Sequence, residues 1–193
     1  MKIPERITTE RLVLRQPRLD DAGRVFEEYG RDPEVTRYLT WTPLETIKQA
    51  EEFLGLRVLA GWLREEEFSW AIPRADSNML IGMIACRLNE QGAELGFVLG
   101  RRYWNQGYVT EAARAVMDQA FSFLTVSKVW ATCDVENLAS ARVLEKVGMT
   151  RERILKRWVV RPSLSSEPRD AFLFARVREG ANKHNEPGSR DTL

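Results

Sequence analysis

The stretch from Ala93 to Leu124 constrains the fold most, because a strand-like segment leads through a short loop directly into a helix. Residues 93–99, AELGFVL, are apolar and β-prone, which predicts a strand. After Gly107, apolar residues recur at helical spacing and give one face that would pack on a sheet: Ala113, Val116, Met117, Ala120, Phe121 and Leu124. The N–H groups in the first turn of such a helix lack internal partners, so the loop is a candidate anion site.

The order of the predicted elements indicates an α/β (α+β) fold with a mixed, mostly antiparallel central sheet. The predicted strands are residues 12–14, 68–73, 80–88, 93–99, 128–135, 153–160 and 171–177. Helices are expected from Asp20 to Gly30, from about Leu44 past Leu59, after Gly107 and from Asn137, and a Ser- and Pro-rich loop from Arg161 to Asp170. We therefore expect about seven strands flanked by about four helices.

Composition bounds the class of protein. With 193 residues and 44% hydrophobic content, the chain is long enough for one well-buried domain, which we expect over residues 1–179. Residues 180–193 have almost no apolar side chains and are expected to be a disordered tail. The 29 basic and 28 acidic residues nearly cancel, so no overall field favours nucleic acid or an anionic membrane.

The cysteines and the histidine argue against a metal site. Cys86 and Cys133 lack metal-ligand spacing, and the only histidine, His184, lies in the polar tail. We therefore expect neither a metal nor a histidine-dependent triad. No segment has the character of a signal peptide or a membrane span, which predicts a cytoplasmic protein with reduced thiols.

A second motif follows the central helix. Residues 137–149, NLASARVLEKVGM, begin with Asn and carry Gly148 where a helix would end. Together with the W-x-x-G-Y-x-T-E-A loop from Trp104, this segment resembles the GNAT superfamily of acetyl-CoA-dependent N-acetyltransferases, and most closely its RimJ/RimL-like branch. The resemblance runs from about Ile7 to Arg178. Two loop positions depart from it: Asn105 replaces a Gly, and Val109 replaces a Gly or Ala.

The resemblance implies a site for acetyl-CoA. Its pyrophosphate would lie on the loop and helix start, and its pantetheine arm would pair with the edge of the preceding strand. The implied cofactor-binding residues are Phe97, Val98, Leu99, Arg102, Trp104, Asn105, Gln106, Gly107, Tyr108, Val109, Thr110, Asn137 and Arg142. From spacing alone, Asn137 is equally well a helix N-cap, and each arginine is equally well an ordinary surface charge.

Two residues are the candidates for catalysis. The resemblance implies that Ser140 donates a proton to the departing sulfur and that Glu94 accepts the proton of the amine. Alternation along the strand places Glu94, Gly96 and Val98 on one face of the sheet. The alternatives stay open at this stage: Ser140 can be a tolerated polar residue in the first helical turn, and Glu94 can be the partner of a nearby arginine.

The acceptor is less constrained than the donor. In the resembled family, the region of Tyr38 and Trp41 forms one wall of the acceptor groove, although aromatic residues between helices also serve as core anchors. The favoured acceptor is the α-amine of a protein or peptide. The alternatives are a small amine (an aminoglycoside, a polyamine or an amino acid), or a non-catalytic acyl-CoA sensor. Exposed strand edges are compatible with a homodimer.

Overall fold

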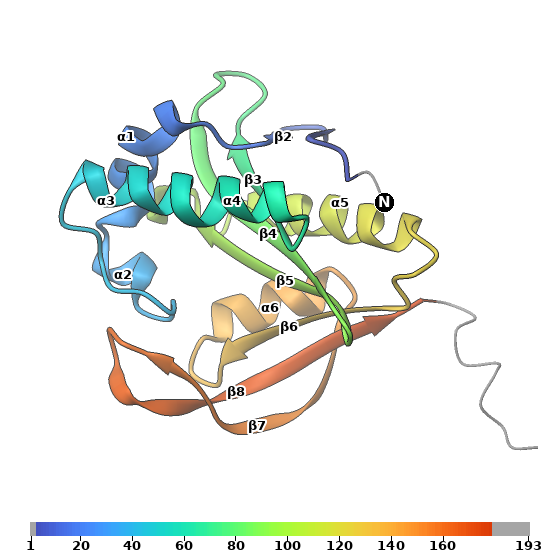
Figure 1. The fold of residues 1–193 in the computed structure, drawn as a ribbon. Helices are drawn as coiled ribbons and strands as arrows, with labels where there is room; N and C mark the ends of the chain where they lie inside the picture. Colours follow the sequence, from blue (N-terminus) through green and yellow to red (C-terminus); the bar gives the residue numbers. More distant parts are fainter. Residues whose placement is uncertain (1–2, 179–193) are drawn as a thin grey trace, which may run out of the picture.

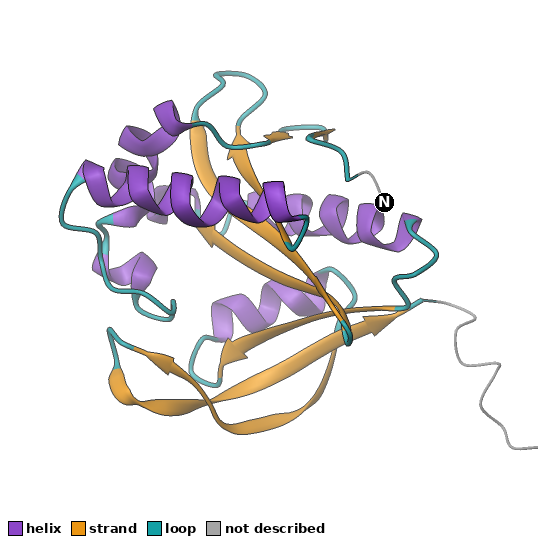
Figure 2. Cartoon of the chain, viewed as in Figure 1, coloured by secondary structure: helices purple, strands orange, loops and turns teal. Residues whose placement is uncertain are grey.

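The computed structural model describes residues 3–178, so the predicted tail and His184 lie outside the described range. Within that range the chain forms one eight-stranded sheet with helices on both faces (Figure 1). Runs of strands and runs of helices follow one another along the chain, as in an α+β domain (Figure 2). The predicted fold class is confirmed.

The strands of the sheet are antiparallel to their neighbours except at one position. They are β1 (Arg6–Thr8), β2 (Val13–Arg15), β3 (Glu67–Pro73), β4 (Leu80–Asn89), β5 (Gly92–Leu99), β6 (Lys128–Asp134), β7 (Thr150–Arg161) and β8 (Ser165–Val177). Their order in the sheet is β1-β2-β3-β4-β5-β6-β8-β7, and β5 and β6 are the parallel pair. The strand missing from the predicted set is β1, whose short sequence RIT has no alternating apolar pattern and is extended because it pairs with β2.

The helices form five runs in the described chain. These are α1 (Ala22–Val25) with a π-helical turn at Phe26–Gly30, α2 (Pro33–Thr36), α3 (Ile47–Glu52) continuing through a π-helical segment at Phe53–Leu59 into α4 (Ala60–Arg64), α5 (Tyr108–Ser122), and α6 (Leu138–Lys146). The helix predicted from about Leu44 begins at Ile47, because Thr46 caps it. The Thr46 hydroxyl accepts a hydrogen bond from the Gln49 N–H at 3.3 Å.

Side-chain alternation along β5 divides the core between the two faces of the sheet. Leu95 and Leu99 pack in the cluster that includes Val116 of α5. Val98 packs in the other cluster, with Val25 of α1 and the helices before β3. The predicted alternation is thus confirmed, and the acyl-transfer candidates on β5 lie between two helical layers (Figure 1).

The segment predicted as a loop from Arg161 to Asp170 is mostly strand, and this prediction was wrong. β7 extends to Arg161 and β8 begins at Ser165, so the turn covers only residues 162–164. Pro168 is tolerated because it lies beyond the end of β6, whose pairing with β8 begins at Ala171. The ion pair between Lys156 and Asp170, at 2.6 Å, also joins the two arms of this hairpin.

Candidate active site

The sheet opens between β5 and β6. Their parallel pairing is limited to Ala93 with Val129 and Glu94 with Trp130. The rest of β5 stays paired with β4 as far as Leu99, but no ladder joins it to β6 in the described chain. Backbone N–H and C=O groups that lose a strand partner need another one. The open edge of β5 can therefore pair with the amides of an extended ligand.

The loop after β5 leads into α5 at the same end of the opening. Gly107 has φ 81° and Asn105 has φ 59°, both in the left-handed region. No side chain caps the first turn of α5, so its N–H groups are available to an anion. Asn105 thus adopts a left-handed conformation that glycine ordinarily takes, and Val109 packs against the core instead of occupying the loop.

Arg11, which is distant in the sequence, contacts both this loop and the first turn of α5. The Arg11 Nε donates to Glu111 Oε2 at 2.7 Å, and its Nη1 donates to the Gln106 carbonyl at 3.0 Å. Thr9 Oγ1 donates to Glu111 Oε1 at 2.6 Å. Burial alone would raise the pKa of Glu111, but the hydrogen bonds from Thr9 and Arg11 hold it below its ordinary value. The sequence around Arg11 indicates no role for it, because a partner 100 residues away leaves no local pattern.

Two further loop residues have partners within the protein. The Trp104 indole donates to the Leu99 carbonyl at 2.8 Å, which ties the loop to the end of β5. Arg102 forms an ion pair with the buried Glu28, so much of its charge is already neutralised. Arg142 lies exposed on α6. Of the predicted phosphate contacts, the backbone of the loop is thus better placed than the Arg102 guanidinium.

The start of α6 brings Ser140 to the end of β6. The Asn137 Oδ1 accepts a hydrogen bond from the Ser140 N–H at 3.1 Å, so Asn137 is the N-cap of this helix. Ser140 is half-buried on α6 near Cys133 of β6. Burial raises the pKa of Cys133 to about 11, while the charge of Arg161 and the neighbouring Ser140 hydroxyl act in the opposite direction. Ser140 thus lies on the β6 side of the opening.

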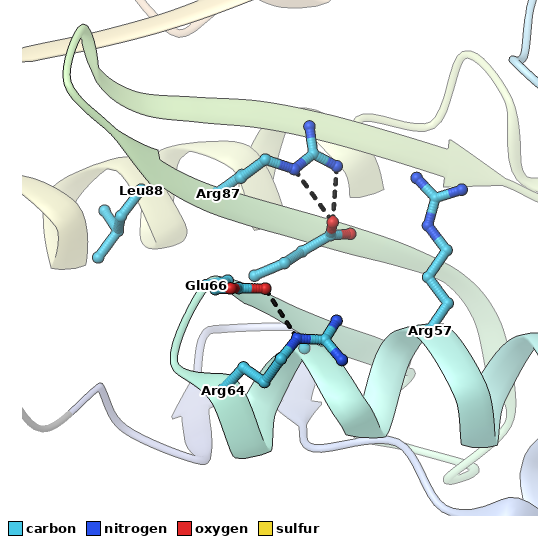
Figure 3. A pocket seen from close by; sticks show the side chains of 7 residues that line it. Arg57, Arg64, Glu66, Arg87 and Leu88 are labelled. Atoms are coloured by element: carbon cyan, nitrogen blue, oxygen red, sulfur yellow. Dashed lines mark hydrogen bonds and ion pairs between the residues drawn. The ribbon is translucent and has the colours of Figure 1, made fainter.

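Glu94 is held by an arginine on the neighbouring strand. Its Oε2 accepts from Arg87 Nη1 at 2.8 Å, and Arg87 also contacts Glu67 at 2.6 Å. Arg87 lines a cavity of about 420 Å³ (Figure 3). The lining residues are Arg57, Gly61, Arg64, Glu66, Glu67, Arg87 and Leu88. The alternative of an arginine partner for Glu94 is therefore present in the structure.

The two predicted acceptor residues lie between α2 and α3. Trp41 packs on Phe53, with ring centroids 6.1 Å apart, and belongs to the core under α1 and α3. The Arg37 guanidinium lies 5.5 Å from the centroid of the Tyr38 ring. Both aromatic side chains remain half-buried. Trp41 thus packs against the core and is also partly exposed in the segment between α2 and α3.

The described residues lack a cluster of metal-ligating side chains and a helix able to span a membrane. Over residues 3–178, no three His, Cys, Asp or Glu side chains are grouped so as to hold a metal ion. In that same range, none of the helices has the length and apolarity needed to cross a membrane.

Known proteins combine this fold with the same sequence pattern. A family model described as an acetyltransferase (GNAT) domain matches residues 11–150. The uncharacterized N-acetyltransferase YoaA from Bacillus subtilis (strain 168) is 31% identical over 176 residues, which cover 89% of this chain and 96% of YoaA. A GNAT-family acetyltransferase from Bacillus anthracis is 28% identical, with a TM-score of 0.76 over 89% of this chain and 98% of that one.

A RimL enzyme shares the fold at lower identity. RimL, the ribosomal L7/L12 alpha-N-protein acetyltransferase in complex with coenzyme A, has a TM-score of 0.77 at 18% identity. The similarity covers 91% of this chain and 97% of RimL. The match to the family model and the identity to YoaA settle the family, and the RimJ/RimL-like fold agrees with it. The chain belongs to the GNAT family of acetyltransferases.

Proposed function

We propose that this chain transfers the acetyl group of acetyl-CoA to the α-amine of a protein or peptide N-terminus. The observation that carries the proposal is the opening between β5 and β6 beside the uncapped start of α5. The name of RimL, an α-N-protein acetyltransferase bound to coenzyme A, supports both the donor and the acceptor by analogy. The presence of both Ser140 and Glu94 in the chain favours an enzyme over a non-catalytic sensor.

The donor would be held mainly by backbone. The N–H groups of Gln106 to Thr110 would bind the pyrophosphate at the positive end of the α5 dipole. The free edge of β5 at Phe97, Val98 and Leu99 would pair with the amides of the pantetheine arm. Trp104, Asn105, Tyr108 and Val109 would shape this site, while Asn137, Arg102 and Arg142 would line its outer part.

The proton transfers would fall to side chains of this chain. Bound acetyl-CoA supplies an acetyl group activated as a thioester. Glu94, held by Arg87, would accept through a water molecule the proton that the amine loses as its nitrogen bonds to the acetyl carbon. Ser140 would donate a hydrogen bond and a proton to the sulfur as the carbon–sulfur bond breaks. The proton on Glu94 then passes to water and Ser140 regains one from water, so both side chains return to their starting forms and the products are an amide and a free thiol.

Turnover on a panel of acceptors tests the proposal. Release of the free thiol from acetyl-CoA would be followed with a thiol-reactive dye, with mass spectrometry locating the acetyl group on the acceptor. The panel would hold Ser-, Ala- and Asp-starting peptides, polyamines, aminoglycosides and amino acids. Acetylation of the peptide α-amine is expected. Turnover on small amines alone would contradict the proposed acceptor, and tight acetyl-CoA binding without turnover on any member would favour the sensor.

We also propose that the protein forms a homodimer. β7 is an edge strand of the sheet and exposes the large apolar side chains Ile154 and Trp158, at 47% and 48%. Such an edge is stabilised by association with a second copy. Sedimentation of the native protein is expected to give twice the mass of one chain. The Trp158→Glu variant is expected to give the mass of one chain. A monomer at all concentrations of the native chain would contradict this proposal.

A further inference from the structure

Arg161, the last residue of β7, is a buried arginine with unused hydrogen-bond donors. It is 7% exposed and is the one arginine in the described chain that is buried. Its Nε is buried and has no hydrogen-bond partner among those residues. Arginine is almost never buried unless it is paired, because removal of its charge from water is costly. The unused donors therefore indicate a partner that binds from outside the chain.

The neighbouring carboxylates are already engaged by a different arginine. Arg169 contacts Asp134 at 2.7 Å and Glu136 at 3.0 Å. Asp134 also accepts a hydrogen bond from the Glu136 N–H at 3.0 Å. Burial lowers the pKa of Arg161, and the charge of Asp134 offsets this only in part. Asp134 thus moderates the charge of Arg161 without occupying its donors.

The position of Arg161 relates it to the proposed site. β6 ends at Asp134, and Arg161 lies in the part of the β7–β8 hairpin that extends past that end. Burial raises the pKa of the Cys133 thiol, and the charge of Arg161 acts in the opposite direction, as does the neighbouring Ser140. The hairpin and the segment after α2 lie at the same end of the molecule (Figure 1). A ligand group that reaches Arg161 would therefore come from an acceptor bound at the opening.

We propose that Arg161 binds a carboxylate carried by the acceptor, so that the enzyme prefers peptides with Asp or Glu beside the N-terminal residue. This inference rests on the proposed acetyl transfer to peptide α-amines. The two Nη groups donate no hydrogen bond within the described chain and, unlike the Nε, are not sealed from solvent. Together they form a planar fork that fits the two oxygens of a carboxylate. The departing sulfur has a single acceptor atom and would leave one of these donors unused, so the pair favours a two-oxygen ligand.

A matched pair of peptides isolates the charge of the acceptor. The pair begins Ser-Asp and Ser-Asn and is otherwise identical, so the two differ by one negative charge at nearly constant shape. Native enzyme is expected to show at least about tenfold higher kcat/KM for Ser-Asp, which is the discrimination that loss of one bidentate pair produces. In Arg161→Gln this preference is expected to fall to about onefold through a higher KM for Ser-Asp.

Four further measurements separate the possible outcomes. Calorimetry should give the same acetyl-CoA affinity for Arg161→Gln as for the native chain. Arg161→Lys should recover part of the preference for Ser-Asp over Ser-Asn, because lysine keeps the charge without the planar fork. Arg153→Gln, an exposed arginine on the same strand, is the matched control and should keep the full preference. Thermal unfolding shows whether Arg161→Gln is folded. If it is not, the peptide preference of Arg161→Lys decides whether Arg161 binds the carboxylate.

Several results would overturn the inference. Equal kcat/KM for the two peptides in the native enzyme would refute the carboxylate preference while leaving acetyl transfer intact. An equal loss of kcat on both peptides in Arg161→Gln would assign the arginine to the leaving sulfur or to structure. Absence of turnover on both peptides would refute the proposed function, and the inference with it.

Discussion

Replacement of Gly107 by valine tests whether the start of α5 binds the donor. Gly107 lies at φ 81° and ψ 0°, where a residue with a Cβ is strained by about 1–2 kcal/mol. The added Cβ would meet only the flexible end of Arg11, with Nη2 at 3.4 Å, so the cost arises from the backbone. Relaxation of φ to negative values would rotate the peptide that joins Gly107 to Tyr108 and would redirect the Tyr108 N–H.

The size of the effect follows from the hydrogen bond that is lost. A hydrogen bond to a charged group contributes about 1.5–3 kcal/mol, which corresponds to a roughly 10- to 100-fold weaker Kd. Calorimetric titration of Gly107→Val with acetyl-CoA should therefore give a Kd at least about tenfold above that of the native chain. The thermal midpoint should fall by only a few degrees, because the strain is confined to one residue.

Two control variants make this measurement specific. Gly107→Asn should bind acetyl-CoA nearly as well as the native chain, because Asn adopts left-handed backbone more readily than other non-glycine residues. Gly23→Ala, in α1 with no atom within 4 Å of the added Cβ, should leave the Kd unchanged. An unchanged Kd in a folded Gly107→Val variant would refute the assignment of the pyrophosphate to this turn.

Three other substitutions test the chemistry and the stability. Ser140→Ala should lower kcat by about 100-fold with little change in KM for acetyl-CoA. The control Ser122→Ala, at the far end of α5, should keep native kinetics. Full kcat in Ser140→Ala would exclude this serine as the proton donor. Glu94→Gln should lower kcat with little change in KM for acetyl-CoA, and full kcat would exclude Glu94 as the base. For Asp134, burial raises the pKa, but its hydrogen bonds and charge contacts with Arg169 lower it overall. Its stabilising contribution is therefore present at neutral pH and is lost as the pH falls below about 4. Urea unfolding should show Asp134→Asn to be less stable than the native chain at neutral pH and closer to it in acid, and an equal difference at both would contradict this.

Local signals in the sequence predicted the centre of the site. The apolar run before Arg101 and the helical spacing after Gly107 specify β5 and α5, since both patterns depend on residues close together in the chain. The helix signals after β6 were equally informative: Asn137 is the N-cap, and Gly148 adopts φ 84°. These elements are where propensity, capping and tertiary packing agree.

Other features depend on contacts that one sequence does not display. The Arg11–Glu111 pair joins residues 100 apart. The β7–β8 hairpin replaces a predicted loop because pairing across the strands outweighs the turn propensity of its Ser and Pro residues. The buried state of Arg161 also follows from that hairpin, since an arginine in a polar segment is ordinarily exposed.

Amide hydrogen exchange, followed residue by residue with NMR, tests the acetyl-CoA site most directly. β5 has a paired edge toward β4 and an open edge toward β6 beyond Glu94. Saturating acetyl-CoA is predicted to slow exchange at those amides of residues 96–99 that face the open edge and at residues 107–110, with little change in β3. Protection confined to another region, such as the cavity lined by Arg57 and Arg87, would contradict the assignment of the donor to the β5–β6 opening.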